Sequence, residues 1–135
     1  MRLDAIPLFG IIKGRLHHLG ERQKLIAENV ANADTPGFTP RDLKPFTLAG
    51  MRAPATGGVG AVRTHAMHIG SAPVRATPWK PVASPDSETT LDGNSVVLEE
   101  EMIKMAEARN HYDAAIGLYQ KSLGLLRTAA RRPGG

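Results

Sequence analysis

The sequence predicts a mainly α-helical chain, in which a helix near each terminus pairs with the other as an antiparallel, coiled-coil-like hairpin. Two observations support this prediction. Apolar residues recur at alternating intervals of three and four near both ends, and proline and glycine interrupt the middle. We expect an N-terminal helix with its closing turn over residues 1–38, a flexible or irregular middle over 39–92, and a long C-terminal helix with a tail over 93–135.

The first helix is predicted over residues 8–32. Pro7 suits its first turn, where the missing proline N–H removes no helical hydrogen bond. Pro36 disfavours helical backbone angles at Thr35 and Gly37 accepts a positive φ, so the helix should end before them. The apolar residues expected to line its pairing seam, with Gln23 completing the spacing, are Phe9, Ile12, Leu16, Leu19, Ile26 and Val30.

The middle segment, residues 39–92, predicts loop structure. It contains seven prolines, and no apolar period persists in it beyond a few residues. Short strands are expected only around residues 59–62 and 67–69. Between Thr39 and Pro85 there are six basic residues and one acidic residue, so the positive charge of the chain is concentrated where its pattern is weakest.

The second helix is predicted from about Val96 to Ala130, which gives a length of roughly 50 Å at ~1.5 Å per residue. Asp92, Asn94 and Ser95 offer oxygens for capping its first turn, where acidic side chains also favour the helix dipole. The residues expected to line its seam are Leu98, Met102, Met105, Tyr112, Ile116, Tyr119, Leu123 and Leu126.

Pairing these two helices leaves apolar residues beside each seam unburied, and such flanks are typical of association surfaces. Glycines within both helices each cost roughly 1 kcal/mol relative to alanine. We therefore expect the free chain to be poorly ordered at its ends and to fold on assembly. The flanking residues expected to contact neighbouring copies are Leu8, Ile11, Ile103, Leu118 and Leu125.

The chemistry of an enzyme is missing from the pattern, and no catalytic, metal-binding or cofactor-binding residue is predicted. The chain has no cysteine, and the pair His65 and His68 lies in a Pro/Gly-rich loop without a carboxylate at ligand spacing. Three consecutive acids, Glu99 to Glu101, point in different directions around a helix and cannot converge as a catalytic pair.

Membrane insertion and nucleic-acid binding are not expected either. No apolar run approaches the ~20 residues that span a bilayer, and the N-terminus lacks the apolar core of a cleaved signal peptide. The basic residues of the middle segment are dispersed, and only Phe46 and Trp79 could stack there on bases. A helical adaptor that binds partner helices, and more remotely a basic nucleic-acid-binding protein, remain as alternative functions.

One short stretch resembles a known family. The residues Asn29, Ala31, Asn32, Thr35, Gly37 and Phe38 match the N-x-A-N-x-x-T-x-G-[FY] pattern that closes the first helix of flagellar rod, hook and hook-associated axial proteins. The C-terminal segment adds a second match, from Gly93-Asn94-Ser95-Val96 to Leu123-Gly124-Leu125-Leu126-Arg127, which is similar to proximal rod proteins of the basal body. Together the two matches cover about 75 residues and leave 39–92 without one.

The resemblance implies a structural subunit of the flagellar rod in the bacterial periplasm, which transmits torque and lines the export channel. Such subunits self-assemble through their terminal helices and contact copies of themselves and other rod and basal-body proteins. The flagellar type III export apparatus would carry the chain without a cleaved signal peptide. The seam residues would then hold the helix pair, and the turn at residues 32–38 would fix how the chain leaves it.

Overall fold

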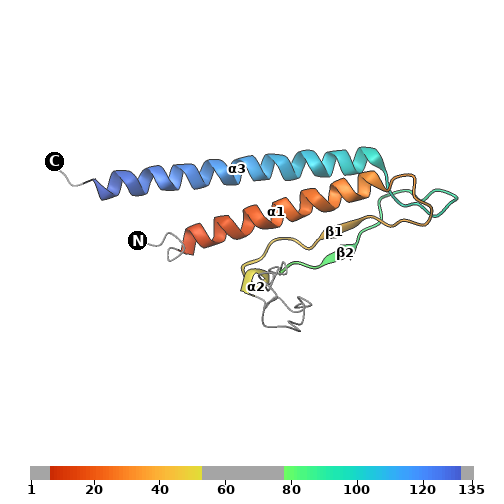
Figure 1. Cartoon of the computed structure of the whole chain (residues 1–135), viewed down its shortest axis with the longest axis horizontal. Coiled ribbons are helices and arrows are strands. Elements are labelled where there is room, and N and C mark those ends of the chain that lie inside the picture. Colours follow the sequence, from red (N-terminus) through yellow and green to blue (C-terminus); the bar gives the residue numbers. More distant parts are fainter. Residues whose placement is uncertain (1–6, 53–77, 132–135) are drawn as a thin grey trace, which may run out of the picture.

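The computed structural model describes residues 7–52 and 78–131 (Figure 1). Two long helices dominate it, and a small two-stranded sheet with a short helix lies beside the first of them. The prediction of a mainly helical chain with paired terminal helices is therefore confirmed. In chain order the elements are α1 (Pro7–Ala31), β1 (Arg41–Leu43), α2 (Leu48–Arg52), β2 (Pro81–Ala83) and α3 (Leu98–Ala130).

The two long helices, α1 and α3, run antiparallel and pack against one another along their length, and we call them the helix pair (Figure 1). Their bounds agree closely with the expected ones. Pro7 occupies the first position of α1, as its fixed φ and missing N–H favour. Within the described residues, neither helix is long and apolar enough to cross a membrane.

The start of α3 differs from the prediction. Val97 is the N-cap residue and its side chain makes no capping hydrogen bond, because the helix begins two or more residues after the polar side chains expected to cap it. Asp86 acts in their place, since its Oδ2 accepts a hydrogen bond of 2.8 Å from the Val97 N–H. Asn94 Oδ1 accepts instead from the Val96 N–H, at 2.9 Å. A residue distant in the sequence therefore satisfies the helix terminus.

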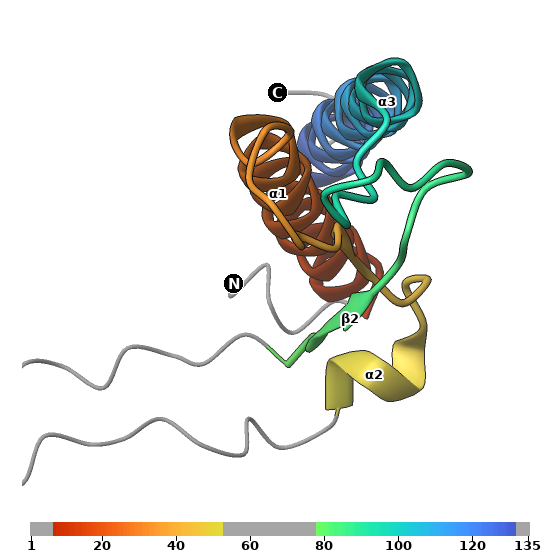
Figure 2. The ribbon, with the colours of Figure 1, turned by 90° about the vertical axis from the view of Figure 1, so that its right-hand side faces the viewer.

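The middle of the chain contains more ordered structure than its composition predicts. β1 and β2 pair antiparallel, with Arg41 opposite Ala83 and Leu43 opposite Pro81. We call residues 41–52 and 78–83 the arm, which lies along α1 (Figure 2). The strands expected around 59–62 and 67–69 lie outside the described residues. Three-residue strands are too short to produce a recognisable alternation, which explains why the sequence gives no sign of β1 and β2.

A small apolar cluster attaches the arm to the helix pair. Leu25 of α1 packs there with Leu43 of β1 and with Trp79, and the partly buried Phe46 covers them. Trp79 is the single tryptophan of the chain, and it is nine-tenths buried. Large side chains placed beside loop residues thus supply a second, smaller core outside the helix pair.

Candidate functional site: the helix pair and its polar junction

The face of α3 that packs on α1 is made of small and polar residues. The buried residues of α3 are Glu101, Ala108, Ala115 and Ser122, spaced seven apart. Facing them, α1 buries larger side chains, so small residues of one helix meet bulky residues of the other. The buried residues of α1 are Phe9, Ile12, His18, Leu19, Leu25, Ile26 and Asn29.

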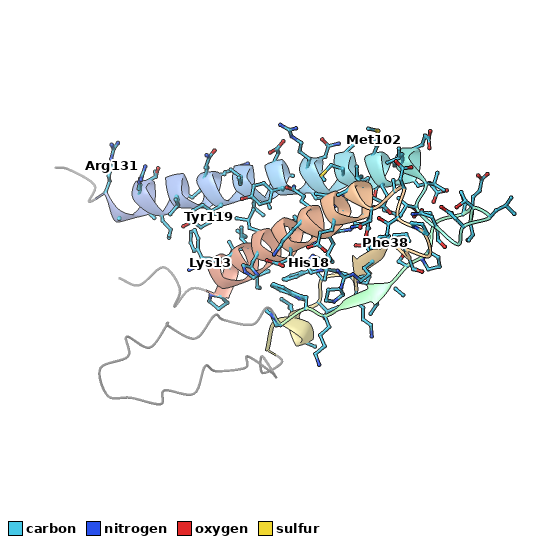
Figure 3. All side chains as sticks on the ribbon, turned by 45° about the vertical axis from the view of Figure 1, so that its right-hand side comes forward. Lys13, His18, Phe38, Met102, Tyr119 and Arg131 are labelled. Carbon is cyan, nitrogen blue, oxygen red and sulfur yellow. The ribbon has the colours of Figure 1, made fainter. Side chains whose placement is uncertain are left out.

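The observed contact face of α3 differs from the predicted seam by a rotation of the helix. Leu98 and Met102 were expected between the helices, but they are 42% and 65% exposed, and Met102 lies on the side of α3 away from α1 (Figure 3). Val30 of α1 is likewise 36% exposed. These three residues therefore lie outside the buried part of the contact between the helices. The physical reason is that small residues let two helix backbones approach, so they occupy the centre of the contact.

The other predicted seam residues lie at or beside the contact. Of the α1 set, Phe9, Ile12, Leu19 and Ile26 are buried and Leu16 is partly buried. On α3, the larger side chains border the row of small residues. The α3 residues of the predicted seam that are partly buried are Met105, Tyr112, Ile116, Tyr119, Leu123 and Leu126.

An aromatic contact joins the helices near the chain termini. Tyr119 of α3 points toward α1 (Figure 3), where its ring meets the ring of Phe9 edge to face, with centroids 5.4 Å apart and planes at 89°. Such edge-to-face pairs contribute about 0.5–1.5 kcal/mol beyond the area they bury. This contact fixes one end of the helix pair.

A polar junction fixes the opposite end. Asn29 Nδ2 donates to Glu101 Oε2 at 3.0 Å and to the Arg41 carbonyl at 2.8 Å, and Asn29 Oδ1 accepts from the Arg41 N–H at 2.9 Å. Lys104 Nζ then bridges Glu101 Oε1 at 2.8 Å and Asp86 Oδ1 at 2.6 Å. We call these five residues the polar junction, because they connect α1, α3, β1 and the segment that precedes α3.

The charges of the polar junction are largely removed from water. The side chain of Glu101 is 0% exposed and that of Asp86 is 1% exposed, while Lys104 keeps 22%. Burial alone would lower the pKa of Lys104, but its hydrogen bonds to Asp86 and Glu101 outweigh burial and raise that pKa above its ordinary value. A buried carboxylate with this many partners selects one relative position of the two helices.

The closing turn, residues 32–38, is held by hydrogen bonds of the motif residues. Asn32 Nδ2 donates to the Glu28 carbonyl at 2.8 Å, and Thr35 Oγ1 donates to Asn32 Oδ1 at 3.1 Å. Gly37 adopts a φ of +72°, a conformation that residues with a Cβ rarely take. Ala31 ends α1 with its side chain exposed.

The same turn is bound to the segment that enters α3. Asn94, which is 2% exposed, donates from Nδ2 to the carbonyls of Asn32 at 2.9 Å and Thr35 at 2.7 Å. The Phe38 carbonyl accepts from the Ser95 N–H at 3.0 Å. The motif therefore both ends α1 and provides the surface on which α3 begins.

Four residues of this region were not predicted to have these roles. Glu101 was expected to complement the helix dipole, Asp86 fell within the predicted loop and Asn94 was expected to cap the helix, while Lys104 had no predicted role. One signal was available for Glu101, because it occupies the first position of the seven-residue series that continues with Ala108 and Ala115. Nothing in the local sequence indicates Asp86, whose partners follow from tertiary contacts.

Several large apolar side chains remain uncovered in the isolated chain. On α3 they lie outside the contact with α1, and exposed apolar residues gathered on one element mark association surfaces. Those of α3 are Leu98, Met102, Ile103, Leu118 and Leu125. Among the described residues, no three His, Asp or Glu side chains gather as a metal site would require. The pair His65 and His68 lies outside the described residues.

These features define a class of protein: an elongated structural subunit, whose two helices are held together by specific polar contacts and whose second helix leaves several large apolar side chains exposed. Residues 14–39, which cover most of α1 and the whole closing turn, match the family model described as "Flagella basal body rod protein".

The chain is similar to known flagellar proteins over most of its length. It is 34% identical over 117 residues to the flagellar basal body rod protein FlgB of Agrobacterium fabrum (82% of this chain and 83% of that protein). It is 35% identical over 127 residues to FlgB of Escherichia coli K12 and 31% identical over 121 residues to FlgB of Salmonella typhimurium, each alignment covering 85% of both chains.

The chain belongs to the FlgB family of flagellar basal body rod proteins. It is therefore a structural, non-enzymatic subunit of the bacterial flagellar basal-body rod. As part of the flagellum, it serves motility. Association with other components of the basal body follows from this identity. The family gives no support to the alternatives of a helical adaptor or a nucleic-acid-binding protein.

Proposed function

We propose that this subunit builds the rod by packing its helix pair side by side with those of neighbouring subunits, both copies of itself and other rod proteins. The assembled helices would transmit torque and line the export channel within the periplasmic rod. The observation that carries this proposal is the set of large apolar side chains exposed on α3, outside its contact with α1. Met102 and Ile103 are 65% and 61% exposed there, and Leu118 and Leu125 are 49% and 64% exposed.

The energetics favour such packing. Burying an exposed Leu, Ile or Met side chain completely stabilises an interface by about 1.5–3 kcal/mol. Several of these side chains on each subunit would offset the free energy lost when two molecules become one. The polar junction would keep α1 and α3 in one relative position, so that every copy presents the same outer face. A fixed helix pair is also what torque transmission requires of a repeated part.

The mode of delivery forms a second part of the proposal. We infer that the flagellar type III export apparatus carries this chain to the rod and that no signal peptide is cleaved from it. Loss of the protein from the periplasm of a strain that lacks the export apparatus would support this route. Periplasmic delivery in such a strain, or a shortened N-terminus in purified rods, would contradict it.

The packing proposal is tested by placing a charge on the outer side of α3. We expect Ile103→Glu and Leu118→Glu to leave the helix pair folded, as measured by circular dichroism, and to abolish both swimming and the recovery of rods. Gln120→Glu adds the same charge at another exposed position of α3 and should preserve swimming. Normal motility of both test variants would exclude this face as the subunit contact.

A further inference from the structure

His18 of α1 is a buried histidine at the base of the arm. Its side chain is 95% buried, and its Nε2 lies 2.8 Å from the Lys44 carbonyl. Because a carbonyl only accepts, Nε2 must carry the proton, which leaves Nδ1 with a lone pair in the neutral ring. Nδ1 is also buried and has no hydrogen-bond partner among the described residues. The site therefore accommodates the neutral ring and offers nothing to a second N–H.

Aromatic rings of the arm surround this histidine (Figure 3 labels His18 beneath α1). Trp79 meets the His18 ring edge to face with centroids 5.3 Å apart, and Phe46 does so at 5.7 Å. The ring of His17 also lies near Trp79, with centroids 5.3 Å apart and planes at 38°. Two histidines of α1 therefore contact the arm, and of these His18 is buried while His17 is exposed.

We propose that His18 is a proton-operated latch, which holds the arm against α1 while its ring is neutral and releases the arm when the ring is protonated. Protonation would place an N–H at the buried Nδ1, where no acceptor lies among the described residues, and a positive charge on a ring that is 95% buried. A buried, unpaired charge of this kind is strongly unfavourable. Detaching the arm returns the ring to water, where the charge is solvated.

The charged groups around His18 support this direction. Arg15 and Arg22 of the same helix repel a positive charge on His18. His111 of α3 lines a cavity of about 360 Å³ together with His18. Asp42 of β1 attracts a positive charge on His18, but both Asp42 oxygens already pair with Arg22, at 3.0 and 3.1 Å. Lys44 contributes its carbonyl, which favours protonation, while its own side chain is exposed.

The balance of these effects lowers the affinity of His18 for a proton. Burial, aided by the two arginines, lowers the pKa of His18 below 6.5 despite the hydrogen bond to the Lys44 carbonyl. A histidine whose pKa is lowered in the closed state stabilises that state fully above pH 6.5. This stabilisation is lost as the pH falls toward the lowered pKa. Between the two values, the ratio of closed to open arm should fall about tenfold per pH unit.

The fluorescence of Trp79 reports on the arm directly, because the chain contains no other tryptophan. We expect the full-length protein to show buried-tryptophan emission at pH 8 and a shift to longer wavelength as the pH falls below 6.5. His18→Gln keeps an amide N–H for the Lys44 carbonyl but cannot titrate, so its emission should stay constant over this range. Because His17 also contacts Trp79, His17→Gln tests whether the shift belongs to that histidine instead, and this variant should retain the shift.

The ring protons of His18, followed by NMR, provide a second measurement that is independent of quenching. Their titration should have a midpoint below 6.5 and coincide with the emission shift. The latch is refuted if His18→Gln shows the same shift, if emission does not change while His18 titrates, or if Trp79 is already exposed at pH 8. This inference goes beyond rod assembly, since each of these outcomes is independent of whether α3 packs against neighbouring subunits.

Discussion

Asn29 of α1 and Glu101 of α3 are 72 residues apart in the sequence, yet they share a buried hydrogen bond of 3.0 Å between Nδ2 and Oε2. Asn29 belongs to the motif by which the family resemblance is noticed, whereas Glu101 is one of three consecutive acids on a helix. Their contact explains why the motif extends back into α1, beyond the turn itself. The asparagine aligns the second helix as well as the chain reversal.

Removing the Glu101 carboxylate should destabilise the fold. We expect Glu101→Ala to lower the free energy of unfolding by about 3 kcal/mol, because Asn29 loses an acceptor and Lys104 keeps only Asp86. Glu99→Ala removes an exposed acid from the same helical turn and should change stability by no more than about 0.5 kcal/mol. Urea unfolding followed by circular dichroism measures both. Equal effects would mean that the polar junction does not stabilise the helix pair.

The small residues of α3 should not tolerate enlargement. Ala108 is 0% exposed at the contact with α1, so Ala108→Leu must separate the helices and cost about 1–3 kcal/mol or more. Ala106→Leu makes the same change on the exposed side of α3 and should be close to neutral. Thermal unfolding of the two variants distinguishes them. A leucine tolerated at position 108 would show that the contact is looser than its burial implies.

Two glycine substitutions should change the stability of the fold in opposite directions. Gly93 has a φ of +84°, and a Cβ there would lie 3.3 Å from the Gly37 Cα, so Gly93→Ala should destabilise the fold by about 1–2 kcal/mol or more. Gly124 lies inside α3 with open space around it, so Gly124→Ala should stabilise the fold by about 0.5–1 kcal/mol. Melting temperatures provide the test, and a gain from Gly93→Ala would contradict the observed backbone conformation.

Stability should also decline in alkali through Lys104. The pKa of Lys104 is raised above 10.5 in the folded chain, so its contribution is complete below that pH and is lost as the pH rises through the raised value. Lys104→Met should therefore lower stability at pH 8 and flatten the alkaline decline above pH 10.5. Lys121→Met, at an exposed position of α3, should leave the decline unchanged. Parallel pH profiles for the wild type and Lys104→Met would refute this role.

The elements that sequence reasoning predicts correctly depend on local or periodic signals. Pro7, the turn at residues 32–38 and the apolar spacing of both termini define α1 and α3 to within about two residues. The rotation of α3 is not predicted. The sequence does not reveal that Ala108 and Ala115, rather than larger residues such as Met102, are buried where α3 packs on α1. Apolar size alone is a poor guide wherever two backbones approach.

The remaining differences concern partners that are distant in the chain. Asp86 binds the N-terminus of α3 at Val97, 11 residues along the chain, and pairs with Lys104, 18 residues along, so both contacts form only once the chain between has folded. His18 is not part of the seam predicted for α1, and nothing nearby in the sequence indicates that Trp79 and Phe46 would cover it. Tertiary contacts of this kind determine burial without leaving a periodic trace.

The closing turn has a consequence for how such subunits diversify. The Gly37 N–H donates to the Asp92 carbonyl at 2.9 Å, and the Ser95 N–H to the Phe38 carbonyl at 3.0 Å. The segment that leaves α1 and the segment that enters α3 are thus hydrogen-bonded to each other, and we call this crossing at residues 37–38 and 92–95 the neck. Because the ends are already joined, lengthening the chain beyond the neck costs only a slowly growing loop entropy. The chain between Phe38 and Asp92 can therefore vary in length and sequence while the helix pair stays the same.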